Sequence, residues 1–232
     1  MAASAQAALK VLTREIVACE KCPRLRRHCL EVARVKRRAY RDWEYWGRPV
    51  PGFGDPRARV LVIGLAPGAH GSNRTGRMFT GDRSGDFLYR ALHETTFAAQ
   101  PESRSREDGL RLSGIYISAA ARCAPPGNRP TPGELANCRP YLEREIDLLK
   151  DVRVVVALGA VAFRTYLSVL RDRGRITSLS AFNFSHHVVH STAPGDPVLI
   201  GSYHPSQQNT STGRLTAAML REVFETARRL TE

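Results

Sequence analysis

Five cysteines carry the most distinctive side-chain chemistry in this sequence. Cys19 and Cys22 form a C-x2-C pair, and Cys123 and Cys138 form a second pair with fourteen residues between them. Thiolates at such spacings bind metal ions or iron–sulfur clusters. The fifth cysteine, Cys29, falls on the apolar stripe of its predicted helix, where a buried cysteine packs as a small hydrophobic residue. The pattern therefore predicts a four-thiolate metal site built from the two pairs.

The spacing leaves the metal open between zinc and a 4Fe–4S cluster. Zinc ribbons use two C-x2-C knuckles, each covering one side of a tetrahedral ion. Here only Cys19 and Cys22 form a knuckle, whereas Cys123 and Cys138 span a proline-rich loop and the start of a helix. This wider arrangement favours the larger 4Fe–4S cluster. In either case the metal would staple the N-terminal helices to the loop after the second strand.

Three polar segments each follow a short apolar run. The first is GLAPGAHGSNRTGRMFTGD, from Gly64 to Asp82, and the others are RCAPPGNRPTP, from Arg122, and SYHPSQQNTSTGRL, from Ser202. The first lacks the lysine of a phosphate-binding P-loop and the glycine spacing of a dinucleotide-binding fingerprint. Its backbone N–H groups, with little side chain around them, are suited to close on a flat ligand or an anionic oxygen.

The elements that must position these segments alternate between strands and helices. Apolar, β-branched runs predict strands at Val60–Leu65, Ile115–Ala119, Val152–Leu158 and Val198–Ser202. Helices are predicted at 4–18, from Pro23 onward, and at 84–95, 131–150, 160–170 and 212–230. The helix at 131–150 is the clearest, because Thr131 and Glu134 form a capping box around Pro132.

This order of elements predicts a three-layer α/β/α sandwich around a central four-stranded parallel sheet. Ligand sites in such folds lie beyond the carboxyl ends of the strands, so the three polar segments are expected to converge there.

The charge balance indicates a polyanionic partner. The formal charge is +13 and the pI is near 10.2. Only four of the 35 basic residues are lysines, so 31 are arginines. Arginine makes planar, bidentate contacts to phosphate, and an excess of this size points to nucleic acid. A GC-rich genome would explain arginine over lysine, but it would not explain the net charge.

The remaining composition is that of a globular protein. Hydrophobic residues make up 42% of the 232 residues, enough for a sizeable core in one domain over 1–232. The stretch before Cys22 has neither the basic nor the continuous apolar region of a signal peptide, and no stretch reaches the length of a membrane span. We therefore expect a single domain, a cytoplasmic location and no membrane partner.

The three polar segments, taken in order, resemble the motifs of the uracil-DNA glycosylase superfamily, in particular family five, its iron–sulfur branch. The cysteine spacings also match that family's cluster ligands, and the resemblance runs from about residue 8 to 230. It implies a four-stranded parallel α/β/α fold with a 4Fe–4S cofactor on Cys19, Cys22, Cys123 and Cys138. It also implies a monofunctional DNA glycosylase of base excision repair, which flips a deaminated base out of DNA and hydrolyses its N-glycosidic bond.

Cleavage of this bond places positive charge on the sugar and negative charge on the leaving base. The resemblance gives His204 the role of a hydrogen-bond donor to the base O2, which would stabilise the leaving anion, with an ordinary loop histidine as the alternative. Phe79 would stack on the flipped base, with a core phenylalanine as the alternative. Asp82 would orient water or stabilise the sugar cation, with an N-cap as the alternative. Asn128 would contact the sugar or water, with an ordinary turn residue as the alternative.

Further substrate contacts follow from the same resemblance. Ser206, Asn209 and Arg214 would contact phosphate or the minor groove, with a solvated helix position as the alternative for Arg214. The backbone around Gly64 to Gly68 would contact the base and nearby phosphate. The predicted substrate-binding residues are Gly64, Leu65, Ala66, Pro67, Gly68, His70, Asn73, Phe79, Ser206, Asn209 and Arg214.

Two features set this sequence apart from the wider superfamily. The apolar Leu65 and Ala66 follow Gly64, where other branches place a carboxylate or an amide. Ala119 stands where other branches have an asparagine that reads the Watson–Crick edge of uracil. A pocket without these groups predicts activity on hypoxanthine and xanthine as well as uracil. No lysine lies in the three segments, which argues against a lyase step through a Schiff base.

Two other classes of protein share part of this pattern. A non-enzymatic, zinc-stapled nucleic-acid-binding module fits the charge and the cysteines but leaves the three polar segments unexplained. An iron–sulfur nuclease would need clustered carboxylates for Mg²⁺, and only Asp82 and Asp86 lie near the predicted site. We therefore expect an enzyme that acts as a monomer on single- or double-stranded DNA containing deaminated bases.

Overall fold

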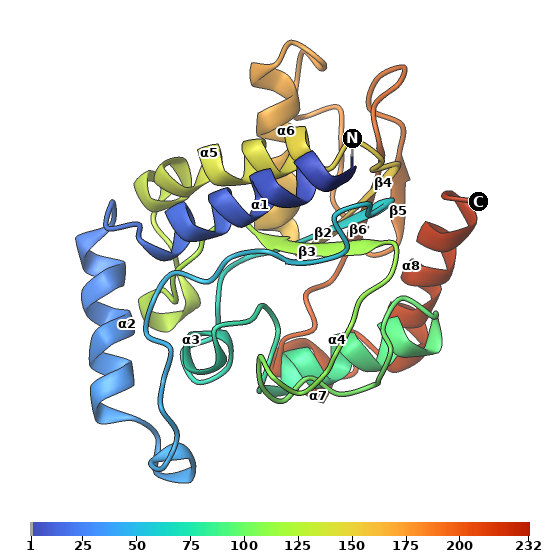
Figure 1. The fold of residues 1–232 in the computed structure, drawn as a ribbon. Coiled ribbons are helices and arrows are strands. Elements are labelled where there is room, and N and C mark those ends of the chain that lie inside the picture. Colours follow the sequence, from blue (N-terminus) through green and yellow to red (C-terminus); the bar gives the residue numbers. More distant parts are fainter. Residues whose placement is uncertain (1) are drawn as a thin grey trace.

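A computed structural model describes residues 2–232 and places a six-stranded sheet at the centre of the molecule, in the order β1-β3-β2-β4-β6-β5 (Figure 1). The four middle strands pair in parallel; they are β3 (Ile115–Ala119), β2 (Val60–Gly64), β4 (Val154–Leu158) and β6 (Val198–Ser202). The short β1 (Phe53–Gly54) and β5 (Val188–His190) pair antiparallel at the two edges.

The expected four-stranded parallel sheet is therefore the centre of a larger, mixed sheet. The prediction was wrong about the extent of the sheet, because edge strands of two and three residues are too short to show an alternating or a continuous apolar pattern.

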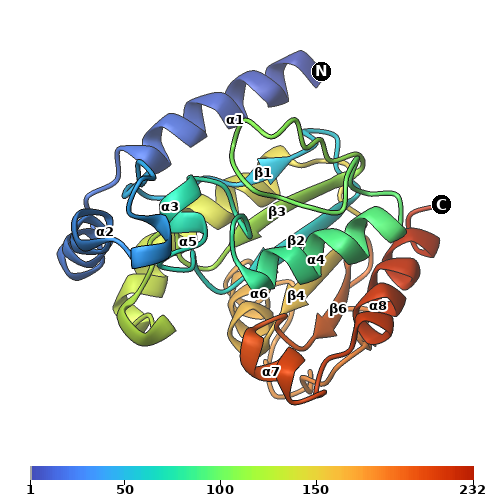
Figure 2. The same cartoon turned by 90° about the horizontal axis from the view of Figure 1, so that it is seen from below.

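Helices cover both faces of the sheet, as a three-layer sandwich requires. α4 (Arg83–Glu94) and α8 (Ala217–Arg229) pack against each other below one face, as Figure 2 shows. The other face is covered by α5 (Pro132–Leu148) and α6 (Ala160–Asp172), with α1 (Ala2–Val17) lying on α5. Alternate residues of β2 point to opposite faces of the sheet. Val60 and Val62 pack toward α4 and α8, whereas Leu61 and Ile63 pack toward α5 and α6.

The capping box predicted for α5 is present. The hydroxyl of Thr131 accepts a hydrogen bond from the backbone N–H of Glu134 at 3.2 Å, and the Glu134 carboxylate accepts one from the backbone N–H of Thr131 at 2.8 Å. The remaining short helices are α2 (Pro23–Val35), η1 (Arg38–Tyr40), α3 (Ser72–Thr75), η2 (Pro126–Asn128) and α7 (Gln207–Ser211). Over the described residues, no helix combines the length and the apolar composition that crossing a bilayer requires.

The predicted helix at 212–230 is wrong over its first turn. Gly213 adopts φ +71°, a left-handed conformation that stops α7, and the chain restarts as α8 only at Ala217. The hydroxyl of Thr216 caps α8 by accepting a hydrogen bond from the Met219 N–H at 3.2 Å. Leu215 is buried between the two helices, so an apolar residue that fits a helical stripe instead anchors the connection.

Candidate active site

The carboxyl ends of the four parallel strands lie at one edge of the sheet. Gly64 at the end of β2 stands opposite Ala119 of β3, and Leu158 of β4 stands opposite Ser202 of β6. The three polar segments start at this edge, as the parallel order predicts. The candidate site is therefore carried by loops that a rigid sheet holds in place.

The ring of Phe79 lies against the end of β2. A Cβ at Gly64 would stand 2.8 Å from Cε2 and Cζ of Phe79, so only glycine leaves room for the ring. Phe79 itself has φ +51°, a conformation that costs a non-glycine residue about 1 kcal/mol. A Cβ at Gly85 would overlap the Phe79 carbonyl, so the start of α4 closes on the same residue. Phe79 is 9% exposed and joins the core under β2, so it is packed as well as placed at the site.

His204 follows β6 and faces Phe79. The two ring centroids are 5.8 Å apart and the ring planes are tilted by 31°. His204 is half-buried, and protein atoms surround most of its ring. This burial lowers the pKa of His204 to about 4. The imidazole is therefore neutral at pH 7, where it keeps one N–H donor and can stabilise an anion without carrying charge itself.

The N-cap alternative for Asp82 is confirmed, and its role toward water or the sugar cation stays a prediction. One carboxylate oxygen, Oδ1, caps α4 by accepting a hydrogen bond from the Gly85 N–H at 3.0 Å. The other oxygen, Oδ2, faces the backbone of the first polar segment, where a Cβ at Gly68 would come within 2.7 Å and a Cβ at Gly71 would overlap it. Burial, followed by the neighbouring Asp86 charge, raises the pKa of Asp82, while the Gly85 and Ser84 N–H groups and Arg74 oppose the rise.

The first polar segment supplies unused backbone donors, as its composition predicts. The carbonyls of Gly64 and Leu65 accept from the Ala120 and Ala121 N–H groups, each at 2.9 Å, and so extend the pairing with β3. Within the described chain, the N–H groups of Ala66 and Gly68 have no backbone acceptor. Pro67, between them, carries no N–H group. Within the described chain, these two donors are thus available for an oxygen of a ligand.

Two residues predicted to bind substrate instead support this loop. The Nδ1 atom of His70 lies 3.1 Å from the Tyr45 hydroxyl, and burial, with Arg37, Arg74 and His28, lowers the pKa of His70. Asn73 is fully buried and donates to the carbonyls of Cys29 and Ala69 at 3.3 and 3.4 Å. Tyr45 and Cys29 lie far away in sequence, so no local pattern identifies these two partners.

The third polar segment is organised around His204. Asn209 donates from Nδ2 to the His204 carbonyl at 2.8 Å, and the Ser206 hydroxyl caps α7 by accepting from the Asn209 N–H at 3.4 Å. The Arg214 guanidinium lies over the Tyr203 ring at 4.6 Å. Ser206 and Asn209 therefore position the loop that carries His204, and Arg214 is exposed beside it.

Asn128 and Gly159 are two further residues in the loops at the carboxyl ends of the strands. Asn128 is exposed at a turn with φ +57°, and among the described residues its one recorded bond runs from its N–H to the Pro125 carbonyl. The turn alternative thus accounts for its conformation, and contact with sugar or water stays a prediction. Gly159, which our sequence analysis did not single out, ends β4 with φ +96° and lies beside the His204 Cβ.

The cysteines gather on the side of the molecule where α2 meets the loop after β3. Cys22, Cys29 and Cys123 lie in one buried cluster with Leu25 and Ala124. Cys138 is also buried; burial raises its pKa, and nearby Cys22 and Cys19 act in the same direction. The prediction that Cys29 is buried is confirmed, but its thiol lies beside Cys123 rather than in a separate core.

The sequence left zinc and a 4Fe–4S cluster open as the group that the cysteine thiols would bind. Within residues 2–232 no three His, Cys, Asp or Glu side chains are placed to hold one metal ion. The four thiols of the predicted set are buried or half-buried and come from three chain segments, and their binding of a cluster stays a prediction. Two buried arginines adjoin them, since Arg26 acts on Cys123 and Arg122 on Cys138. Arg122 already pairs through Nη2 with the buried Glu145 carboxylate, and in the described chain its Nε and Nη1 have no hydrogen-bond partner.

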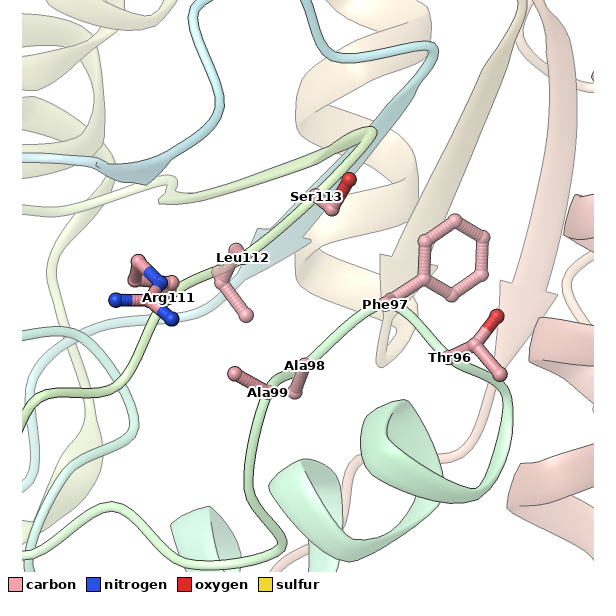
Figure 3. Close-up of a pocket in the computed structure, with 7 residues that line it drawn as sticks. All are labelled: Thr96, Phe97, Ala98, Ala99, Arg111, Leu112 and Ser113. Carbon is pink, nitrogen blue, oxygen red and sulfur yellow. The ribbon is translucent and has the colours of Figure 1, made fainter.

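Two pockets lie away from this site. Figure 3 shows a pocket of about 310 Å³ between the loop after α4 and the segment before β3, lined by Thr96, Phe97, Ala98, Ala99, Arg111, Leu112 and Ser113. A second pocket, of about 680 Å³, is lined by charged residues near the amino ends of β2 and β4. None of the lining residues belongs to the three polar segments, so neither pocket is assigned to the candidate chemistry.

Comparison with known proteins points to one superfamily. A family model described as "Uracil DNA glycosylase superfamily" matches residues 51–228. The chain is 53% identical to a Type-5 uracil-DNA glycosylase of Thermus thermophilus, over 93% of this chain and 94% of that relative. It is 46% identical to a Type-5 uracil-DNA glycosylase of Pyrobaculum aerophilum, over 91% and 88% of the two chains. A Type-4 uracil-DNA glycosylase of Sulfurisphaera tokodaii is 25% identical over 85% of this chain and 74% of its own.

Proposed function

Because this chain belongs to the uracil-DNA glycosylase superfamily, we propose that it is a DNA glycosylase that hydrolyses the N-glycosidic bond of uracil in DNA. The observation that carries the proposal is the neutral His204 beside Phe79 at the carboxyl edge of the sheet. This pair offers an aromatic face for a flipped base and a donor for its developing charge.

We assign each site residue to the part of the substrate, base or sugar, on which charge develops during cleavage. The flipped base stacks on Phe79, and the free N–H groups of Ala66 and Gly68 bind its carbonyl oxygens. The His204 N–H donates to the base O2, and this bond strengthens as the base leaves with negative charge. The Asp82 carboxylate stabilises positive charge on the sugar or orients the attacking water. Asn128 is assigned to the sugar or to that water.

We extend the proposed substrates to hypoxanthine and xanthine. Ala119 is buried, lies opposite Gly64 and joins the same core cluster as Phe79, which supports a methyl group facing the base where an amide would read uracil. Recognition then rests on backbone donors and an aromatic face, which accept any base with a suitably placed carbonyl. Adenine and cytosine present amino groups at that position, so a hydrogen-bond donor of the base would face a backbone N–H donor of the protein.

Cys19, Cys22, Cys123 and Cys138 are proposed to hold a 4Fe–4S cluster. Such a cluster, when bound, is a group of fixed geometry with one-electron redox capacity. The thiols come from the connection between α1 and α2, from the loop after β3 and from α5, so their ligation would tie these segments together. The catalytic roles above are assigned to protein groups alone. Action as a monomer stays a prediction.

The decisive experiment measures release of free base. Purified protein is incubated in EDTA with an oligonucleotide carrying one uracil, and both uracil and the abasic site are quantified. A double variant, His204→Ala with Asp82→Ala, purified in parallel, controls for contaminating glycosylases. Uracil release by the wild-type protein alone supports the proposal. Binding without release would favour a non-enzymatic module. A parallel reaction with Mg²⁺ and no EDTA tests for a nuclease, which would cleave the strand only there.

A further inference from the structure

One charged and partly aromatic segment remains outside the site described above. Residues 34–43, here called the basic arm, run from the last turn of α2 through η1 to Trp43. The chain changes direction at Lys36, which has φ +56°. In Figure 1 the end of α2 and the turn after it project away from the sandwich, beyond α3. The arm contains five basic residues and one acidic residue.

The arginines of the arm are left without acidic partners. Arg37, Arg38 and Arg41 are exposed, and none of their side chains makes a recorded ion pair or hydrogen bond with the rest of the described chain. By contrast, Arg139, Arg144, Arg171 and Arg173 on α5, α6 and the turn after α6 each pair with a carboxylate. Neighbouring like charges repel one another, so a cluster of unpaired cations is suited to an external polyanion.

Apolar side chains are exposed on or beside the same arm. Val35 and Trp43 within it, and Leu30 one turn before it, are among the large hydrophobic residues that remain open to solvent. Exposed aromatic surface interleaved with arginine is typical of surfaces that bind a nucleic-acid strand, where phosphates meet cations and bases or sugars meet rings.

The inner side of the arm is fixed to the candidate active site. The Arg74 guanidinium carbon lies 4.0 Å from the Tyr40 ring centroid and 4.1 Å from that of Trp43. Arg74 is buried and donates to the carbonyls of His70 and Gly81 at 2.8 and 2.7 Å. It therefore connects the arm to the loop that carries Phe79 and Asp82. A strand that enters the site would pass next to the arm.

On the basis of the proposed function, we propose that the basic arm binds the backbone of the DNA strand that carries the flipped base. Arg37, Arg38 and Arg41 contact its phosphates, and the free face of Trp43 stacks on a neighbouring unpaired base. Arg74 keeps the arm in place through its contacts with Tyr40 and Trp43. The positive charge of the arm requires a polyanionic partner, and for a DNA glycosylase that polyanion is the phosphodiester strand of its substrate.

The test removes three charges from the arm and measures the salt dependence of DNA binding. The variant is Arg37→Gln with Arg38→Gln and Arg41→Gln. Its matched control is Arg57→Gln with Arg59→Gln and Arg153→Gln, which removes three exposed arginines from the amino edge of the sheet. Affinity for a labelled single-stranded oligonucleotide is measured by anisotropy at several salt concentrations, alongside melting temperature and single-turnover base release at saturating enzyme.

We expect the arm variant to lower the magnitude of the slope of log K against log salt by about 2, since each phosphate contact contributes about 0.7 on single strands. Its affinity should fall far more than its base-release rate at saturating enzyme, and the control should keep the wild-type slope. An unchanged slope, or an equal change in the control, would overturn the proposal. A loss of rate without a loss of affinity would also overturn it, because the arm would then act on the site alone. If wild-type protein releases no uracil, the proposed function fails while the slope still tests the arm.

Discussion

The rings of Phe79 and His204 lie 5.8 Å apart, on loops that follow β2 and β6. These strands are separated by β4, so the sheet itself sets the distance between the rings. A base stacked on both faces would need about 7 Å, twice the contact distance between aromatic carbons. The space is too narrow for that arrangement. For a base stacked on Phe79, as proposed, this leaves His204 the edge of the base, where the proposed bond to O2 would form.

Replacement of His204 should slow chemistry more than it weakens binding. We expect His204→Ala to lower the single-turnover rate of uracil release by about 10²–10³, the loss seen when one oxyanion donor is removed. Its dissociation constant for uracil-containing DNA should change by less than about tenfold, because the bond is strong only as charge develops. Rapid-quench kinetics and anisotropy give the two quantities. An unchanged rate would show that His204 only packs against Phe79.

The lowered pKa of His204 predicts how stability depends on pH. In the folded protein this pKa is about 4, below the ordinary value of 6.5 for the unfolded chain. Between these values the unfolded state binds the proton first, so the wild-type free energy of unfolding should fall as pH decreases from 6.5 to 4. Relative to His204→Gln, which does not titrate, the loss should level off below pH 4. Urea unfolding at pH 7.5, 6, 5 and 4 measures the difference, and a constant difference would contradict the burial.

Replacement of Asp82 separates its role as the N-cap of α4 from the proposed role of its negative charge in base release. Asp82→Asn should keep the cap on α4, because asparagine caps as well as aspartate, and should change the free energy of unfolding by only a few tenths of a kcal/mol. Its rate of base release should fall by about 10² or more if the carboxylate faces the sugar. Thr216→Ala is the matched control, since it removes the cap of α8, should cost about 1 kcal/mol, and should leave the rate unchanged. A fully active Asp82→Asn would reduce Asp82 to a helix cap.

Features encoded by local physics were predictable from the sequence. The four central strands and the cap at Thr131 depend on residues that are neighbours along the chain. The parallel order then placed the three polar segments at one edge. The positions of Asp82 and His204 could be predicted in this way, because Asp82 precedes a predicted helix start and His204 follows the end of a strand.

The rest depends on contacts between distant segments. His70 and Asn73 look like ligand-binding residues in sequence, yet their partners are Tyr45 and Cys29, which are brought close only by the fold. Gly213 and Thr216 are stop and start signals, but the apolar stripe continuing through Leu215 concealed the break between α7 and α8. The clustering of Cys29 with Cys123 is likewise a tertiary result, invisible in their separation along the chain.

Iron content should separate the four proposed ligands from the fifth cysteine. Anaerobically purified protein is expected to be brown and to contain about four irons per chain. Cys123→Ser should lose colour and iron, whereas Cys29→Ser should retain both, although the two thiols are neighbours. Elemental analysis and absorption spectra provide the readout. Stoichiometric zinc without iron in the wild-type protein would reject the cluster, and iron loss in Cys29→Ser would add that residue to the ligands.

The breadth of substrate should depend on Ala119. The wild-type protein is expected to release uracil, hypoxanthine and xanthine, and to leave adenine and cytosine in place. Ala119→Asn would put an amide at the end of β3, opposite Gly64 and next to Phe79, where it can pair with the polar edge of uracil. With purines, a buried amide would be left partly unpaired, which costs about 1–3 kcal/mol. We therefore expect the ratio of uracil to hypoxanthine rates to rise about tenfold to a hundredfold in this variant.

Side-chain volume must be separated from hydrogen bonding in that experiment. Ala119→Leu adds comparable bulk without an amide, so it should slow all three substrates together if the space beneath Phe79 is tight. Rates are measured under single turnover on oligonucleotides carrying one lesion each, with melting temperatures to confirm folding. A wild-type protein active on uracil alone would show that other residues already read the base edge. An Asn variant that keeps the wild-type ratio would show that position 119 does not face the base, because an amide in contact with it discriminates between partners it can and cannot satisfy.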